Sequence, residues 1–505
     1  MLAKLFTAAL TGLDASIVAV EADSGGGDFG QITIVGLPDA AISEAKERVR
    51  SALRNCGLPF PRRKITVNLA PADLKKHGPA YDLPIAISIL AIKNKIEFDF
   101  SQCLIIGELS LAGEVRAITG ALPIAISAKQ KGIKNLFLPE QNGIEANMIK
   151  GVNVFPVKHI AELIKHLQGK KLIAPLASQA NFKETKNDND NFDLINIIGQ
   201  EKAKRALEIT AAGGHNLLFF GPPGSGKTLL AKTIPSILPK LSWEEKLEIT
   251  KIYSAAGKLK NGDYLINSRP FRSPHHSSSG VSLVGGGAMP QPGEISLAHR
   301  GVLFLDEFPE FSRSVLENLR QPLEEGIINI SRAAASLKFP AKFMLIAAMN
   351  PCPCGYYGDA RHVCRCSPKQ IHRYRQKLSG PIIDRIDLHV EVPRIALNNI
   401  ARLNPGDNSQ KVRKRIEFAR KIQAKRFKNY SFLTNAEMTK QAIDRFCPLK
   451  PSISEFLNEA AEKLNLSARS YYRILKLSRT IADLENKKEI LIEHLAEALQ
   501  YRPKI

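Results

Sequence analysis

The chain has 505 residues, of which 44% are hydrophobic and 24% are charged, so it is long enough for two or three globular domains. Its formal net charge of +22 favours a polyanionic partner, nucleic acid first, because each neutralised phosphate releases condensed counterions. No apolar run reaches the roughly 18 residues that span a bilayer, and residues 1–13 lack the pattern of a secretory leader, which predicts a cytoplasmic protein with no membrane partner.

The amino-terminal part alternates short apolar strands with helical patterns. We expect strands at Gln31–Val35, Ile65–Leu69 and Leu104–Ile106, and helices at Ala40–Cys56 and Leu83–Ile92. This alternation predicts an α/β domain over residues 1–170. Residues 171–193 become polar and charged, which is typical of a linker between domains.

A second α/β pattern covers residues 194–395. Apolar runs at Asn216–Phe220, Gly301–Leu305 and Phe343–Met349 predict three strands of one parallel sheet. The first strand leads into a glycine-rich motif, which is followed by a helical pattern over Leu229–Ile237. The motif consists of Gly221, Pro222, Pro223, Gly224, Ser225, Gly226, Lys227 and Thr228.

This motif fits G-x-x-x-x-G-K-[ST], and its place between a strand and a helix fits a P-loop that binds ATP. Glycines allow backbone N–H groups to surround phosphates, and Lys227 adds charge at the β and γ oxygens. Thr228 offers its hydroxyl to Mg²⁺. A chance glycine-rich turn is the competing interpretation, and it requires every fixed position of the motif to be coincidental.

Polar side chains end the other two strands. Asp306 and Glu307 follow Gly301–Leu305, where Asp306 is expected to hold Mg²⁺ and Glu307 to polarise the attacking water. Asn350 follows Phe343–Met349 and could orient that water or touch the γ-phosphate. Taken alone, the two carboxylates would be a solvated strand end and the asparagine a turn residue, so these assignments depend on the P-loop.

Four of the seven cysteines lie close together in sequence. They are Cys352, Cys354, Cys364 and Cys366. Four thiolates predict a tetrahedral structural zinc site, and four reduced loop thiols are the alternative because C-x-C spacing is tighter than the usual C-x₂-C. A catalytic metal is excluded, since sulfur would fill all four positions.

Positive charge is concentrated between Pro340 and Leu433, a stretch that contains 19 Lys and Arg residues but only 6 Asp and Glu residues. Part of it lies on an amphipathic helix expected at Lys411–Lys428, for which a solvated face, a membrane surface and DNA contact are all open interpretations. Apolar spacing is helical over Lys411–Lys428 and again over Pro451–Tyr501, which predicts a small all-helical lid over residues 396–505.

Longer motifs give the chain a resemblance to a known family. These are Gly36–Asp39 (GLPD), Pro270–His276 (PFRSPHH), Gly285–Gly287, Pro292–His299 (PGEISLAH) and Asn350–Gly355 (NPCPCG). The chain resembles the ComM/YifB family of magnesium-chelatase-like AAA+ ATPases over nearly its full length. The resemblance implies a hexameric ATP-driven motor that binds single-stranded and branched DNA and promotes branch migration in natural transformation and homologous recombination.

Roles for two arginines follow from that resemblance. Arg385, in the motif GPIIDRID, resembles an arginine finger offered to a neighbouring subunit, and Arg469 resembles the second sensor of the lid, with Ser467 as helix cap. Segments Ile327–Ile330 and Leu337–Phe339 would form a hairpin in a central pore. Loop packing or DNA contact is a better interpretation of His275 and His276 than a shared metal, because adjacent extended residues point to opposite sides.

The amino-terminal domain resembles the proteolytic domain of Lon proteases without its catalytic dyad. Ala80 stands where the family has its serine and Leu122 where it has its lysine, and neither side chain supplies a nucleophile or a base. Two other functions are alternatives to the DNA motor. An ATP-dependent protease conflicts with these two residues, whereas the ATPase subunit of a chelatase-like metal-insertion or protein-remodelling complex shares the same core chemistry.

Overall fold

The structure is a computed structural model that describes residues 2–502 except 26–30, 59, 61–62, 95, 97, 178–191, 260–263, 288–289, 333–334, 360 and 395–405. The chain divides into two compact units. The first contains residues 1–184 and 246–266, and the second contains residues 185–245 and 267–505. None of the helices described has both the length and the apolar character needed to cross a membrane.

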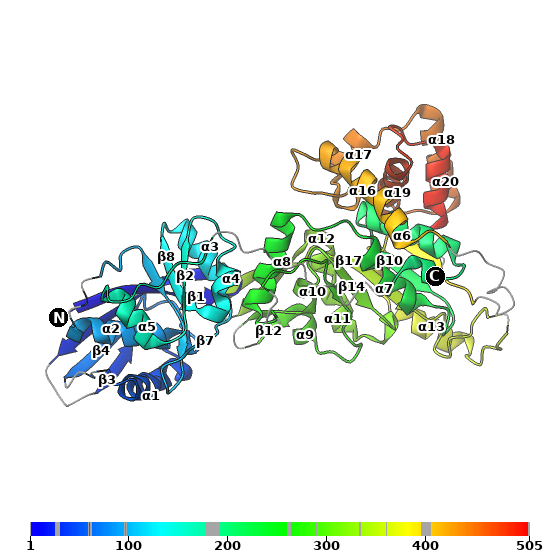
Figure 1. Ribbon diagram of the computed structural model, residues 1–505. Coiled ribbons are helices and arrows are strands. Elements are labelled where there is room, and N and C mark those ends of the chain that lie inside the picture. Colours follow the sequence, from blue (N-terminus) through cyan, green and yellow to red (C-terminus); the bar gives the residue numbers. More distant parts are fainter. Residues whose placement is uncertain are drawn as a thin grey trace. The chain divides into compact units, whose positions relative to one another are not determined.

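The first unit is built on a seven-stranded mixed sheet (Figure 1). Its strand order is β3-β4-β2-β1-β5-β8-β9, and the pairs β3–β4, β1–β5, β5–β8 and β8–β9 are parallel. The strands are β1 (Leu2–Thr11), β2 (Asp14–Gly25), β3 (Ile32–Val35), β4 (Lys64–Ala70), β5 (Cys103–Ile105), β8 (Asn135–Pro139) and β9 (Asn153–Val157). A separate small hairpin joins β6 (Glu108–Leu109) and β7 (Val115–Arg116). The predicted α/β class is confirmed for this part.

Helices cover both faces of this sheet. Side chains alternate between the faces along β1, where Leu5 and Ala9 join one hydrophobic core and Ala8 joins the other. The first core contains α1 (Ala40–Asn55), α2 (Asp82–Asn94) and α5 (Ile160–Leu167), and the second contains α3 (Ala121–Gln130) and α4 (Glu140–Ala146). Leu122 is fully buried in the second core, and Ala80 packs against the same cluster, so both positions of the absent dyad are occupied by apolar packing.

A stretch from the middle of the chain belongs to this first unit. It begins within α8 (Trp243–Ala255) and continues to Ile266, and its Leu265 lies in the core beside α3 and α4. The backbone carbonyl of Ser254 accepts from the N–H of Gly120 at 3.2 Å. Lys251 pairs with Asp14 at 2.7 Å. The sequence pattern placed these residues in the ATPase core and did not anticipate this packing.

The second unit contains a five-stranded parallel sheet with the order β11-β14-β17-β10-β18. Its strands are β11 (Phe271–Arg272), β14 (Val302–Leu305), β17 (Met344–Met349), β10 (Leu217–Phe220) and β18 (Leu388–Glu391). The three strands expected from the sequence are confirmed as parallel neighbours β14, β17 and β10. Every residue of β14 and β17 is buried, as expected for a parallel sheet covered on both faces.

Helices and two hairpins surround this sheet. The helices are α6 (Glu201–Gly213), α7 (Lys227–Ile237), α9 (Gly280–Val284), α10 (Glu294–Leu297), α11 (Arg313–Asn318), α12 (Arg320–Glu325), α13 (Pro368–Gln376) and α14 (Gly380–Ile383). One hairpin pairs β12 (Gly285–Gly286) with β13 (Gln291–Pro292), and the other pairs β15 (Ile327–Arg332) with β16 (Ala335–Pro340). The predicted second hairpin is thus present, although its turn lies outside the described residues. Its place in a pore stays a prediction.

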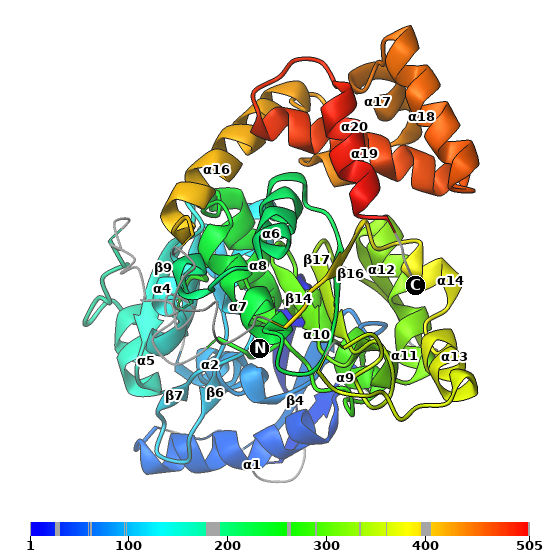
Figure 2. The same ribbon diagram turned by 90° about the vertical axis from the view of Figure 1, so that its right-hand side faces the viewer.

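The carboxyl-terminal part is helical, as predicted (Figure 2). It contains α16 (Ser409–Arg426), α17 (Lys440–Phe446), α18 (Pro451–Lys463), α19 (Ala468–Leu484) and α20 (Ile492–Gln500), which share one hydrophobic core with α6 and α7. Ser467 caps α19 by accepting from the N–H of Ser470, which confirms the predicted cap.

The basic helix α16 uses several of its arginines inside the protein. Arg420 donates to the carbonyl of Ala211 at 2.9 and 3.1 Å, and Arg426 pairs with the fully buried carboxylate of Asp483. Arg415 pairs with Glu208. These arginines therefore hold α16 to its neighbours. The exposed cations of α16 are its lysines, of which Lys411 pairs with Asp407 at 2.8 Å.

Candidate nucleotide-binding site

The glycine-rich motif forms the connection between β10 and α7, at the carboxyl edge of the parallel sheet. A side chain on Gly221 would place Cβ 2.2 Å from the carbonyl oxygen of Val392, so no larger residue fits there. Gly224 and Gly226 have φ values of +74° and +92°, in the left-handed region that glycine adopts at little cost. The sequence of the motif is therefore dictated by its backbone path around the start of α7.

Lys227 is buried and lies at the centre of the site. Its ammonium donates to the carbonyls of Gly221 at 2.7 Å and Pro222 at 2.9 Å, and to Oδ1 of Asn350 at 3.2 Å. Burial lowers the pKa of Lys227 to about 8, so the ammonium remains largely charged near neutral pH. The structure thus brings together the lysine and the asparagine that the sequence placed at separate strand ends.

The predicted Mg²⁺ ligands also lie side by side. Oγ1 of Thr228 donates to Oδ2 of Asp306 at 2.7 Å, which joins the first residues of α7 to the end of β14. A hydroxyl and a carboxylate are both oxygen ligands of the kind that Mg²⁺ prefers. The donor set at this point therefore fits a magnesium ion that also contacts phosphate.

Glu307 follows Asp306 in an unusual backbone conformation, with φ of +51°. Its carboxylate Oε2 lies 3.0 Å from Nδ1 of His276, a residue of the segment that follows β11. The sequence analysis assigned His276 to loop packing or DNA contact and did not connect it with Glu307. The pairing depends on β11 and β14 being neighbours in the sheet, which no local sequence signal reveals.

Arg385 and Arg469 lie at a different place in the second unit. Both donate to Oε1 of Glu324 on α12, Arg469 at 2.8 Å and Arg385 at a shorter distance. All three residues line a cavity of about 590 Å³ that contains no residue of the glycine-rich motif. The structure therefore does not bring these arginines to the P-loop of their own chain, and Glu324 is a partner that sequence reasoning missed.

The four clustered cysteines converge in space. Sγ of Cys352 lies 3.3 Å from that of Cys354 and 3.7 Å from that of Cys364, and all four sulfur atoms, including that of Cys366, lie within 4.8 Å of one another. Backbone N–H groups of Tyr356 and Arg365 lower the pKa of Cys354 to about 6, which favours its thiolate. Four sulfur donors at this spacing fit a tetrahedral zinc ion.

Comparison with protein families assigns most of the chain to one group. A family model for magnesium chelatase subunit ChlI matches residues 193–400, and a model for the carboxyl-terminal part of that subunit matches residues 406–502. A third model, for subunit ChlI of Mg-chelatase, matches residues 20–142. The three matches include residues of both compact units.

Individual relatives give a finer comparison. The chain is 45% identical over 505 residues to competence protein ComM of Haemophilus influenzae, covering 99% of this chain and 97% of that protein. It is 43% identical over 504 residues to uncharacterized protein YifB of Escherichia coli, with the same coverage. The chain is 26% identical over 178 residues to the magnesium-chelatase 38 kDa subunit of Rhodobacter capsulatus, covering 32% of this chain and 50% of that subunit.

Proposed function

Because the chain belongs to the ComM/YifB family of magnesium-chelatase-like AAA+ ATPases, we propose that it is an ATP-driven motor that moves branched DNA. The observation that carries the proposal is the convergence of Lys227, Asn350, Thr228 and Asp306 at the carboxyl ends of three adjacent parallel strands. In an open parallel sheet this edge is where nucleotides bind.

Each side chain has a defined task in ATP hydrolysis. The backbone of Gly221–Lys227 surrounds the phosphates, and Lys227 exchanges its carbonyl contacts for the β and γ oxygens. Thr228 and Asp306 would hold Mg²⁺, which neutralises charge on the transferred phosphoryl group. Glu307 polarises the attacking water, and Asn350 positions it beside Lys227.

The motor works as a ring, which we propose to be a hexamer. Arg385 shares Glu324 with Arg469, the proposed second sensor of the lid, in a cavity that contains no residue of the P-loop, so Arg385 would act on the nucleotide of a neighbouring subunit. An arginine supplied in this way stabilises charge on the γ-phosphoryl group in the transition state. Hydrolysis would then depend on assembly.

DNA is the proposed cargo, in single-stranded and branched form. The charge of +22 supports this choice because a motor that pulls on a strand needs phosphate contacts that exchange readily. The Haemophilus relative is named a competence protein, which supports a role in taking up homologous DNA during natural transformation. Branch migration during recombination is the corresponding reaction.

Zinc is the proposed second metal. Cys352, Cys354, Cys364 and Cys366 would hold it in a closed tetrahedral site, where it stabilises the loop after Asn350 and performs no catalysis.

The test is steady-state ATP hydrolysis by the purified protein with and without single-stranded DNA and a four-way junction. We expect DNA to stimulate hydrolysis, Lys227→Ala to lose nucleotide binding, and Glu307→Gln to bind ATP without turnover. A branch-migration assay with a labelled junction then follows. Hydrolysis that DNA leaves unchanged, together with an intact junction, would overturn the proposal and favour an ATPase subunit that serves a metal-inserting or protein-remodelling partner.

A further inference from the structure

A basic surface is formed by the loop of the candidate zinc site and by the helix that follows it. We call residues 351–366 the cysteine loop, and α13 follows it at Pro368. Residues 351–379 contain six Lys and Arg residues and a single acidic residue, Asp359. Four of these cations, Arg361, Arg365, Lys369 and Arg373, are exposed and form no ion pair with a carboxylate in the part of the chain that the structure describes. By contrast, arginines of α16 bind carbonyl and carboxylate groups of the protein itself.

The cysteine loop also packs directly against the P-loop. Gly355 has a φ of +85°, and a Cβ at this position would lie 2.6 Å from the ring of Pro223. Arg394, which follows β18, donates to the carbonyl of Pro223 at 2.9 and 3.2 Å. The same guanidinium lies 3.5 Å from Asp359 and 5.5 Å from the centre of the Tyr356 ring. A displacement of the loop would therefore move Pro223 both through the direct contact of Gly355 and through Arg394.

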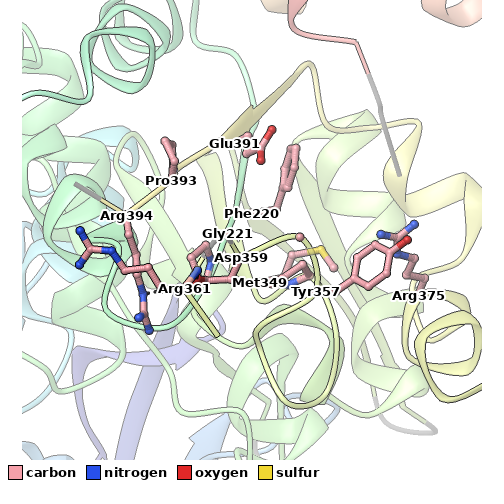
Figure 3. A pocket seen from close by; sticks show the side chains of 13 residues that line it. Phe220, Gly221, Met349, Tyr357, Asp359, Arg361, Arg375, Glu391, Pro393 and Arg394 are labelled. Carbon is pink, nitrogen blue, oxygen red and sulfur yellow. Dashed lines mark hydrogen bonds and ion pairs between the residues drawn. The ribbon is translucent and has the colours of Figure 1, made fainter. Parts of the chain in front are cut away.

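Asp359 connects the two features. Its Oδ1 accepts from the N–H of Arg361 at 2.7 Å, while its carboxylate faces Arg394. Asp359, Arg361 and Arg394 line a cavity of about 350 Å³. Figure 3 shows these three residues toward one end of the cavity and Tyr357 and Arg375 at the other. Gly221 and Pro222 of the P-loop line the same cavity. The basic surface and the nucleotide site thus share one wall.

We propose that the exposed cations of the cysteine loop and α13 bind the phosphate backbone of a DNA strand, and that Asp359 and Arg394 transmit this binding to the P-loop. The inference rests on the proposed function, to which it adds the DNA-contacting surface and its link to hydrolysis. Exposed cations that form no ion pair with a carboxylate leave their positive charge available to phosphates spaced along a strand. A motor also needs DNA contact to alter the nucleotide site. The cysteine loop carries exposed cations and also packs against Pro223 of the P-loop.

The DNA-binding part is tested with a charge-matched pair of triple variants of the full-length, zinc-loaded protein. One carries Arg361→Gln, Arg365→Gln and Arg373→Gln. The other carries Lys131→Gln, Lys134→Gln and Lys150→Gln, which are exposed in the first unit and lower the net charge equally. Binding of fluorescein-labelled oligothymidine is followed by anisotropy across a series of salt concentrations.

We expect the arginine variant to raise the dissociation constant by about tenfold or more and to reduce the slope of log K against log salt by roughly 2, as expected for three lost contacts to single-stranded phosphates. The lysine variant should keep the wild-type slope. Equal effects of the two variants, or wild-type binding by the arginine variant, would overturn the assignment of the surface.

The coupling part is tested with Asp359→Asn, which keeps an acceptor for the N–H of Arg361 and removes the charge opposite Arg394. We expect unchanged zinc content, DNA affinity and hydrolysis without DNA, and loss of most of the stimulation by DNA. Wild-type stimulation in this variant would overturn the coupling. A wild-type protein that neither binds DNA nor hydrolyses ATP would instead refute the proposed function, so the two failures are distinguishable.

Discussion

Arg385 and Arg469 donate to the same carboxylate oxygen of Glu324, although Arg385 precedes β18 and Arg469 lies in the first turn of α19. Two guanidinium groups converge on a single anion and so form a small site of positive charge that one carboxylate only partly neutralises. A phosphate group could replace Glu324 there, because arginine binds carboxylate and phosphate through similar geometry.

Replacing Glu324 tests this arrangement. In Glu324→Gln the two arginines lose the charge that holds them together, and we expect kcat for ATP in the assembled protein to fall roughly tenfold while the KM changes little. Arg385→Ala should cost roughly 10³-fold in kcat, the lower end for a lost arginine finger. Glu325→Gln is the matched control, because Glu325 instead accepts from Gln321. Equal kcat in Glu324→Gln and the control would show that Glu324 has no positioning role.

Nδ1 of His276 lies 3.0 Å from Oε2 of Glu307, so the histidine contacts the carboxylate that we propose to polarise the attacking water. His276→Ala should free this carboxylate, so we expect hydrolysis without DNA to rise severalfold and the ratio of stimulated to basal rate to shrink. His275→Ala is the control, since Nδ1 of His275 lies 2.8 Å from Oγ of Ser277 and does not contact Glu307. A basal rate that falls in His276→Ala would mean that the histidine assists the base.

Metal analysis tests the cysteine cluster. We expect about one zinc ion per chain, retained during dialysis and released with loss of thermal stability by a strong chelator. Cys364→Ser should lose the metal, whereas Cys56→Ser, a free cysteine of the first unit, should keep it. Full zinc content in Cys364→Ser would contradict a site with four sulfur ligands.

Gly355 allows a test of the contact between the cysteine loop and the P-loop. Gly355→Ala would direct a methyl group into Pro223, and we expect the dissociation constant for ATP to rise by an order of magnitude. Gly358→Ala imposes a similar backbone strain, because φ is +81° there, but nothing lies within 4 Å of its Cβ. Weaker ATP binding in both variants would assign the effect to loop strain alone.

His389 gives the second unit a defined pH dependence. Burial, followed by the nearby charge of Arg473, lowers its pKa from 6.5 to about 4. Below pH 6.5 the unfolded chain protonates this histidine, whereas the folded protein keeps the ring neutral until the pH nears 4. The free energy of unfolding therefore falls by up to about 3 kcal/mol as the pH drops from 6.5 to 4. In denaturant titrations, His389→Leu should show a shallower fall in unfolding free energy between pH 6.5 and 4. Parallel curves for the two proteins would exclude His389 as the cause.

Local sequence patterns predicted much of the second unit and part of its site. The strand–motif–helix order places the P-loop, and polar residues at the ends of buried strands identify Asp306 and Asn350, because parallel strands end at a common edge. The three strands are indeed neighbours, and Lys227 and Asn350 are in contact. These features need only short-range patterns and a general rule of sheet construction.

Partners that come from separate parts of the chain required the folded structure. His276 meets Glu307 because β11 lies beside β14, and Glu324 meets Arg385 and Arg469 because three distant segments converge on one cavity. Likewise, the sequence showed four cysteines and a basic stretch but gave no sign that Gly355 packs on Pro223. The sequence by itself determined which groups carry the chemistry, since motif spacing is local. Only the tertiary structure decided which groups touch one another, because side-chain contacts between distant segments follow from packing and leave no periodic signal.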